Sequence, residues 1–286
     1  MDKVKIGVIG GSGISNIEGF AVEETVMPDT PFGKPSGEIK IGVMEGKRVA
    51  FLPRHGYGHV ITPTDIPVQA NIYAFKMLGV EMLISSSAVG SMKEEIAPGH
   101  FVVPTQLIDR TKARPSTFFG DGLVAHIPFD HPYCPKLREI LISEGEKLGL
   151  KIHNGGTYVC IEGPQFSTKA ESLVYQSWGV SIIGMTNIPE AKLAREAEIC
   201  YATIALSTDY DVWREGEEVS VDKVLDTMAK NAKNANKLMQ AVIKALPDES
   251  DCACRHVLQN SIQTSPDKIN KNMVKKLDAI VGKYFK

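Results

Sequence analysis

Short apolar runs alternate with amphipathic segments along most of the chain. Runs rich in apolar and β-branched residues predict strands at residues 3–9, 38–43, 48–52, 81–85, 100–103, 156–160, 181–183 and 201–206. Between several of these runs, apolar residues recur at helical spacing, which predicts helices at residues 68–79, 137–148, 189–199 and 219–245. Such an alternation predicts an α/β fold with a mixed, partly parallel sheet.

The last part of the chain differs in composition from the rest. No linker rich in Pro, Gly or Ser divides residues 1–246, so we predict one α/β domain there. Residues 247–271 are polar, and the amphipathic stretch at 272–285 predicts a terminal helix. We therefore predict two parts, a domain at 1–246 and a polar C-terminal segment at 247–286.

Charge and hydropathy exclude several classes of partner. With a net charge of −2 over 286 residues, the chain has no broad basic field for nucleic acid or an anionic membrane. No apolar run approaches the roughly 18 residues of a transmembrane helix, and the first residues lack the features of a secretory signal. We therefore expect a cytoplasmic protein with no nucleic-acid or membrane partner.

The five cysteines are Cys134, Cys160, Cys200, Cys252 and Cys254. Free, buried thiols are the ordinary state of cytosolic cysteines. The absence of a C-x-x-C pair and the scattering of seven histidines argue against a zinc site. Cys252 and Cys254 lie in a polar stretch that we expect to be exposed, where a C-x-C pair can close a strained disulfide. A disulfide between Cys134 and Cys200 is a further hypothesis, because both flank segments predicted to be well ordered.

Two aspartates, Asp209 and Asp211, directly follow the predicted strand at 201–206. Open α/β sheets bind ligands at the carboxyl ends of their strands, and residues two apart point to the same side of an extended chain. Two close carboxylates raise one another's pKa, so the pair can donate one proton and accept another. The N7 and 6-amino edge of adenine needs this combination. The alternative is an Asp-rich turn that caps the next helix.

Three other loops after predicted strands carry groups that suit an anion. The glycine loop at 10–13 offers backbone N–H groups and the Ser12 hydroxyl, and alternatively is a tight turn. Residues 53–59 offer Arg54 and His55 as hydrogen-bond donors, followed by two glycines, and the alternative is a surface turn. The hydroxyl-rich residues 85–91 suit an oxyanion, or alternatively begin a helix.

A fourth loop, residues 162–168, carries an aromatic residue. Phe166 is suited to stack on a flat heterocycle, although it is alternatively a core residue. Together the loops predict one pocket for a small anion and a nitrogen-rich ring. A dinucleotide-dependent oxidoreductase is disfavoured because Asn16 stands where the glycine fingerprint requires its third glycine.

These segments resemble the purine nucleoside phosphorylase family and, within it, the branch that acts on 5′-methylthioadenosine. The resemblance extends from Val4 to about residue 245, and many short motifs of the family occur in this chain in the same order. They include Gly10-Gly11-Ser12-Gly13, Arg54-His55-Gly56, Gln69-Ala70-Asn71, Ala88-Val89-Gly90-Ser91, Glu162-Gly163-Pro164, Gly184-Met185-Thr186 and Thr208-Asp209-Tyr210-Asp211. It implies a single α/β domain with a distorted central sheet, the nucleoside phosphorylase fold, assembled as a homotrimer or homohexamer.

The resemblance also implies the reaction and the role of each residue. Phosphate would attack C1′ of a purine nucleoside, with no metal or organic cofactor, and release the base. The implied phosphate-binding residues are Ser12, Arg54, His55, Ser87, Ala88 and Thr186. The implied substrate-binding residues are Phe166, Ser167, Met185, Asp209 as the acid at N7, Asp211 at the 6-amino group, Val221, Val224 and Leu225 at the 5′ group, and His126 from a neighbouring subunit. Gln165 is a departure from the family pattern, because many members have arginine at this position.

Several rival functions stay open from the sequence. A nucleosidase would use water in place of phosphate, and a 6-oxopurine nucleoside phosphorylase would prefer inosine to adenosine. A purine-nucleoside sensor without catalysis is a third possibility. Dependence of product release on phosphate, and the rates on the two nucleosides, distinguish these alternatives.

Overall fold

The structure is a computed structural model of the chain. It describes residues 3–11, 18–214, 221–249 and 251–285, without the side chains of residues 221, 223 and 224. Its strands are β1 (Ile6–Gly10), β2 (Ala21–Val26), β3 (Ile39–Met44), β4 (Lys47–Pro53), β5 (Met82–Ser91), β6 (Phe101–Val103), β7 (Gln106–Arg110), β8 (Ile152–Asn154), β9 (Thr157–Ile161), β10 (Ile182–Gly184) and β11 (Cys200–Asp209). The helices are α1 (Val68–Leu78), α2 (Pro135–Lys147), α3 (Lys169–Ser177), α4 (Asn187–Glu196), α5 (Val221–Ala245), α6 (Lys271–Lys276) and α7 (Asp278–Val281).

Strand β5 is the centre of the sheet. It pairs in parallel with β1 and with β11, and its last residues pair antiparallel with β10. The sheet continues beyond β1 through β4 and β3 to β2, and beyond β10 through β9 to β7, while β6 and β8 extend from β11. A strand with three partners distorts the sheet, which confirms the mixed, distorted sheet predicted above.

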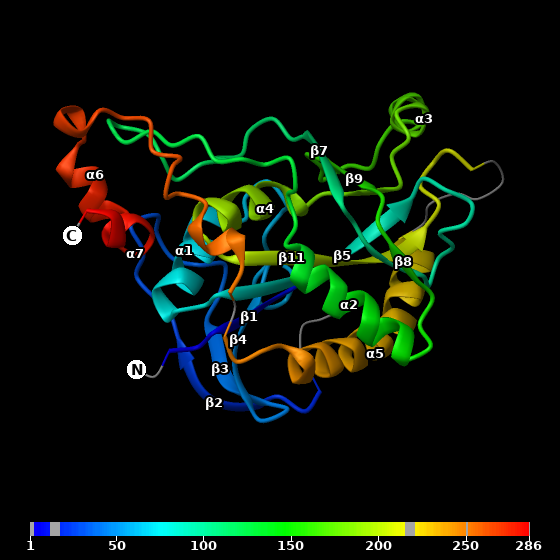
Figure 1. Ribbon diagram of the computed structural model, residues 1–286. Coiled ribbons are helices and arrows are strands. Elements are labelled where there is room, and N and C mark those ends of the chain that lie inside the picture. Colours follow the sequence, from blue (N-terminus) through cyan, green and yellow to red (C-terminus); the bar gives the residue numbers. More distant parts are fainter. Residues whose placement is uncertain (1–2, 12–17, 215–220, 250, 286) are drawn as a thin grey trace.

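Helices cover both faces of the sheet (Figure 1). Helices α1 and α4 bury their apolar residues in one core cluster, and α2 and α5 bury theirs in another. Strand β1 is buried along its whole length and β11 along nearly all of it, because each lies between helical layers. Central strands of this kind appear in the sequence as continuous apolar runs, which is why both were predictable.

The predicted elements agree with the structure except at the sheet edges, at helix α3, which was not predicted, and at residues 85–91. Helix α1 ends before Gly79, whose φ of 94° is the left-handed conformation that glycine favours. Strands β2, β7 and β8 were missed because they are exposed or half-buried, so they lack an apolar run. Residues 85–91, interpreted as a loop, continue strand β5. None of the described helices is long and apolar enough to cross a membrane.

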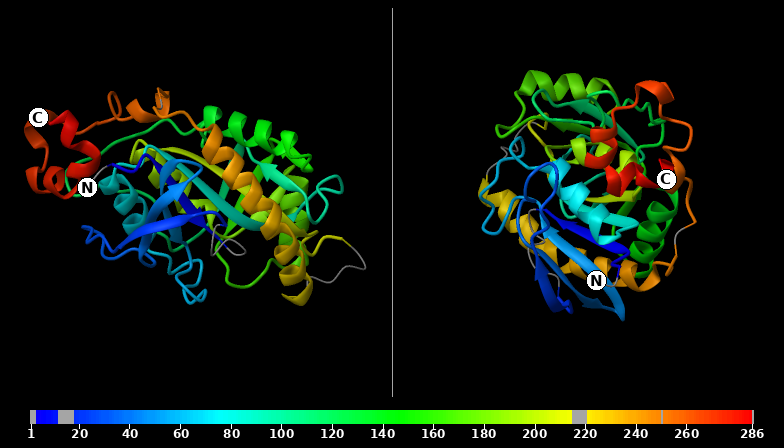
Figure 2. Two further views of the ribbon diagram at one scale, coloured as in Figure 1. Left: turned by 90° about the horizontal axis from the view of Figure 1, so that it is seen from below. Right: turned by 90° about the vertical axis from the view of Figure 1, so that its left-hand side faces the viewer.

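The C-terminal segment packs against the α1 side of the core, close to the N-terminal end of the chain (Figures 1 and 2). Leu258, Leu277 and Val281 are fully buried there. The single terminal helix predicted at 272–285 is wrong. The structure instead has α6, α7 and a short 3-10 turn, because Leu277 interrupts the helix with φ −100° and ψ 20°.

The expectation that Cys252 and Cys254 are exposed is also wrong. Both are buried, with 5% and 3% of their surface accessible, and all five cysteines are free thiols. The hypothetical Cys134–Cys200 disulfide is therefore not formed here, although the two sulfur atoms lie within 4.8 Å of each other. Spacing along the sequence indicated no metal site, whereas the fold brings four of the cysteines together.

Candidate active site

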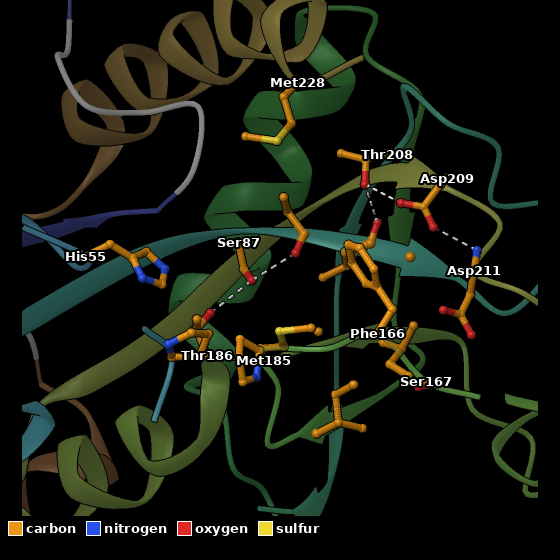
Figure 3. A pocket seen from close by; sticks show the side chains of 18 of the residues that line it. His55, Ser87, Phe166, Ser167, Met185, Thr186, Thr208, Asp209, Asp211 and Met228 are labelled. Atoms are coloured by element: carbon orange, nitrogen blue, oxygen red, sulfur yellow. Dashed lines mark hydrogen bonds between the residues drawn. The ribbon is translucent and has the colours of Figure 1, made fainter. Parts of the chain in front are cut away.

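A cavity of about 300 Å³ opens where β4, β5 and β11 end (Figure 3). It collects the predicted loops into one site. Its lining consists of Arg54, His55, His59, Pro63, Ser87, Ala88, Val89, Gly90, Ile161, Pro164, Phe166, Ser167, Ile183, Gly184, Met185, Thr186, Thr208, Asp209, Asp211 and Met228. In Figure 3, His55, Ser87 and Thr186 lie on one side, and Asp209 and Asp211 lie on the other.

Arg54 is held rigidly beneath the first side of the cavity. Its guanidinium is 1% exposed and forms a two-point ion pair with Glu190, in which Nη2 donates to Oε2 at 3.0 Å and Nε donates to Oε1. Nη1 donates to the carbonyl of Ser86 at 2.8 Å. A guanidinium has five N–H groups, so these three bonds leave two for an anion. The carboxylate also fixes the direction of the fork.

The first loop needs a glycine at position 11. A Cβ atom on Gly11 would lie 2.4 Å from the carbonyl oxygen of Ser86 and 2.5 Å from Nη1 of Arg54. Such contacts are too short for any side chain, so only glycine lets the loop approach the arginine. The backbone N–H of Gly11 donates to Oγ of Ser86 at 3.1 Å. The loop and the arginine are therefore built as one unit.

A cluster of hydroxyl groups lies next to Arg54. Oγ of Ser87 is 3.1 Å from Oγ1 of Thr186 and 3.2 Å from the hydroxyl of Tyr158. Burial raises the pKa of Tyr158 and therefore keeps this phenol protonated. Rotating hydroxyl groups can donate to an oxyanion without carrying charge themselves. Together with Arg54 they make this side of the cavity a site for a small anion.

His55 is neutral in this environment. Burial, followed by the charge of Arg54, lowers the pKa of His55 to about 4. Nδ1 lies 2.8 Å from the carbonyl of Ile61, which requires the ring proton to be on Nδ1. Nε2 is then an acceptor, so it suits a protonated oxygen of an anion. The sequence had suggested His55 as a donor, and the local hydrogen bond gives it the other role.

The two aspartates form the opposite side of the cavity. Oδ1 of Asp209 accepts from the backbone N–H of Asp211 at 2.8 Å, and Oδ2 accepts from the Thr208 hydroxyl at 2.7 Å. Asp211 accepts from the Ser172 hydroxyl of α3. Burial raises the pKa of both carboxyl groups, and the neighbouring Asp211 raises that of Asp209 further. A carboxyl group in such surroundings is suited to hold a proton at a ligand nitrogen.

The loop between β9 and α3 covers the aspartates. Phe166 is 50% exposed at the cavity, so it is available to a ligand ring rather than buried in the core. Oγ of Ser167 is buried without a hydrogen-bond partner among the described residues, which leaves it a free donor at the cavity. A capping box between Thr168 and Glu171 begins α3 and fixes the end of this loop.

The structure does not bring every predicted residue into the cavity. Ser12 and the side chains of Val221 and Val224 lie outside what the structure describes. Leu225 was predicted to face inward, but it is 55% exposed and does not line the cavity, whereas Met228 does. The two residues are three positions, or about 300°, apart around the helix, so the inward face of α5 includes Met228 and ends before Leu225. His126 is exposed and lies outside the cavity of its own chain.

Sequence reasoning assigned no role to three functional residues. Glu190 could have been found, because it is the acidic residue in the first turn of α4, a helix in which most residues are buried. Arg114 had none, yet its guanidinium donates to Glu162 and to the carbonyl of Met185, and so fixes the loop at the cavity. Tyr158 appeared only as part of a predicted strand.

We expect Glu190→Gln to lower the free energy of unfolding by about 3 kcal/mol, because Arg54 then keeps its charge in a buried site without a counter-charge. Phosphate should restore part of this loss by supplying negative charge. Urea unfolding with and without phosphate measures both effects. Glu24→Gln, which breaks a partly exposed ion pair with Arg48, is the matched control and should cost less than about 1 kcal/mol. Equal losses in the two variants would contradict the role of Glu190.

Comparison with known proteins gives the family. Residues 5–244 match the model of the phosphorylase superfamily. The chain is 51% identical over 281 residues to the S-methyl-5′-thioadenosine phosphorylase of Geobacter sulfurreducens, covering 98% of each chain. It is 48% identical to that of Chloroflexus aurantiacus over the whole of both chains.

Solved structures agree with this match. A methylthioadenosine phosphorylase from an Antarctic soil metagenomic library superposes with a TM-score of 0.93 at 44% identity, over 98% of this chain and 99% of that one. A methylthioadenosine phosphorylase from Schistosoma mansoni in complex with adenine gives a TM-score of 0.87 at 35% identity, over 91% of this chain and 99% of that one. With these matches and the cavity at its strand ends, the chain belongs to the phosphorylase superfamily.

Proposed function

We propose that this protein is an S-methyl-5′-thioadenosine phosphorylase, which converts S-methyl-5′-thioadenosine and phosphate into adenine and 5-methylthioribose 1-phosphate. The observation that carries the proposal is the arrangement of one cavity, with an anion site around Arg54 on one side and a buried aspartate pair on the other. Relatives about half identical over their full length carry this name.

The substrates are proposed to occupy the cavity in a fixed order. Phosphate would accept from Arg54 and the hydroxyl groups of Ser87 and Thr186, with the Ala88 backbone beside it, and would donate to Nε2 of His55. The purine would lie against Phe166, near Ser167, with its N7 edge toward Asp209 and its 6-amino group toward Asp211. The ribosyl ring would then lie between them, beside Met185.

The proposed reaction exchanges one bond at C1′ for another. An oxygen of phosphate bonds to C1′ as the bond from C1′ to N9 breaks, and the bonding electron pair passes to the purine. The proton of the Asp209 carboxyl group moves to N7 and neutralises this charge, which typically contributes about 10²–10⁴-fold to the rate. The phosphate charge stabilises the cationic sugar as it forms. Phosphate is the co-substrate, and none of these steps uses a further cofactor.

The 5′ group is proposed to contact α5. Met228 lines the cavity from this helix, and the predicted contacts Val221 and Val224 precede it on the same helix. An apolar lining distinguishes a methylthio group from a hydroxyl by only about 1–3 kcal/mol. We therefore expect kcat/KM for methylthioadenosine to exceed that for adenosine by roughly 10–200-fold, measured with purified enzyme at saturating phosphate. A ratio near one would contradict the apolar 5′ site.

A homotrimer or homohexamer is part of the proposal, with His126 reaching the site of a neighbouring subunit. The exposed position of His126 outside its own cavity supports that role. The cytoplasmic location stays a prediction from the sequence.

One assay tests the function. Purified enzyme is incubated with S-methyl-5′-thioadenosine with and without phosphate, and adenine and the sugar phosphate are quantified by chromatography. We expect adenine to appear only with phosphate, in equal amount to the sugar 1-phosphate. Adenine release at the same rate without phosphate would select a nucleosidase and contradict the proposal.

A further inference from the structure

Four cysteine sulfur atoms converge far from the proposed active site. Cys134 precedes α2, Cys200 begins β11, and Cys252 and Cys254 belong to the C-terminal segment. Their four Sγ atoms all lie within 4.8 Å of one another, and those of Cys134 and Cys252 are 3.6 Å apart. All four residues are at least 95% buried. Three segments of the chain therefore present their thiols to one point.

The sulfur spacing suits a metal ion held by all four thiolates. Zinc binds thiolates at about 2.3 Å in a tetrahedron, which places neighbouring sulfur atoms roughly 3.8 Å apart. The observed spacing includes that distance, and small side-chain rotations bring the remaining pairs to it. A disulfide needs sulfur atoms about 2 Å apart and joins them only in pairs. A compact group of four has the number and arrangement of ligands found in closed structural zinc sites.

The surroundings of the cluster also suit a thiolate complex. Nη1 of Arg195, on α4, donates to Sγ of Cys254 at 3.3 Å. Four thiolates around a divalent ion carry net negative charge, which this guanidinium partly balances. Apolar residues such as Leu137 and Leu246 pack around the cysteines and exclude water. The cluster thus has a charged outer contact and a dry shell.

The position of the cluster argues for a structural role. Cys200 is the first residue of β11 and Asp209 is the last, so the two sites are separated by nearly the whole strand, roughly 30 Å. Cys252 and Cys254 lie just after the domain predicted at 1–246. Ligands from the residue before α2 and from β11 on one side, and from the C-terminal segment on the other, would fasten that segment to the core.

We propose that Cys134, Cys200, Cys252 and Cys254 bind one Zn²⁺ ion as a structural site that joins the C-terminal segment to the sheet. The thiols release their protons to solvent as the metal binds, and no oxidant takes part. The site is independent of the proposed phosphorolysis, since none of its ligands lines the cavity.

Metal content tests the proposal on the full chain. The protein is expressed with added zinc, freed of any histidine tag, purified under reducing conditions without chelator, and analysed by elemental mass spectrometry. We expect about one zinc per chain, falling below about 0.2 in Cys252→Ser and in Cys254→Ser. Cys160→Ser is the matched control, because Cys160 is an equally buried thiol outside the cluster, and it should keep the full zinc content.

A second measurement does not depend on the folding of the cluster variants. Replacing zinc by Co²⁺ in the unaltered protein should give the intense visible bands and sulfur-to-metal charge-transfer absorption of a tetrahedral thiolate complex. Chelation at raised temperature should lower the melting temperature of the unaltered protein and of Cys160→Ser. Protein without stoichiometric zinc and without these cobalt bands would overturn the proposal, whether thiol titration then finds disulfides or five free thiols.

Discussion

Asp209→Asn is expected to lower kcat for S-methyl-5′-thioadenosine by about 10²–10⁴-fold, because the amide cannot give a proton to N7 of the leaving purine. The KM for phosphate should change far less, since Asp209 lies on the opposite side of the cavity from the anion site. In the unaltered enzyme, activity that needs the proton should fall as pH rises through the pKa of Asp209, which burial has raised. Steady-state kinetics over a range of pH measure all three quantities.

Stability separates this chemical loss from a folding defect. Because the pKa of Asp209 is higher in the folded than in the unfolded chain, its contribution to stability is greatest in acid and is lost as pH rises through the folded pKa. Asparagine does not ionise, and its amide can retain hydrogen bonds to Thr208 and to the Asp211 N–H. We therefore expect the melting temperature of Asp209→Asn at neutral pH to equal or exceed that of the unaltered enzyme. An unchanged kcat would remove Asp209 from the acid role.

The second large effect is expected in the choice of base. Adenosine should have a kcat/KM on the order of 10⁴ above that of inosine, because a carboxylate at the 6-position accepts from an amino group and repels a carbonyl oxygen. These two nucleosides share the same sugar, so the comparison isolates the base. Equal rates on inosine and adenosine would contradict the assignment of Asp211 and favour a 6-oxopurine enzyme.

Asp211→Asn provides the reciprocal test. Asparagine tolerates the left-handed backbone of this position, where φ is 51°, so the exchange does not strain the chain. Its amide oxygen can keep the hydrogen bond from Ser172, which leaves the NH₂ group to donate to a 6-oxo purine. We expect the adenosine-to-inosine ratio to fall by at least about tenfold. A ratio that stays the same while both rates fall together would indicate a structural role only.

The sequence by itself determined the central strands and the chemistry at their ends. Strands β1 and β11 and the first residues of β5 are covered on both faces, so they appear as short apolar runs. The loops after parallel strands meet at one edge of a sheet, which allowed Arg54 and Asp209 to be assigned to one pocket before any contact was known. The motif order also indicated the family.

Tertiary structure decided how those groups are held. Glu190 pairs with Arg54 across 136 residues of sequence, and Tyr158 reaches Ser87 across 71. No local periodicity encodes such contacts, because hydrophobic pattern reports burial and not the partner of a buried polar group. The same limit explains why Leu225 was placed inward together with Met228, since the apolar pattern does not show where the inner face of α5 ends.

The cysteines show most clearly the difference between what the sequence determined and what the tertiary structure decided. Their spacing along the chain argued against a metal site, and polar neighbours suggested that Cys252 and Cys254 are exposed. Folding instead buries them against Cys134 and Cys200, because the C-terminal segment docks on the core through Leu258, Leu277 and other apolar residues. Residue types and strand ends were therefore determined by sequence. The meeting of distant side chains was decided only by packing, which depends on the whole chain at once.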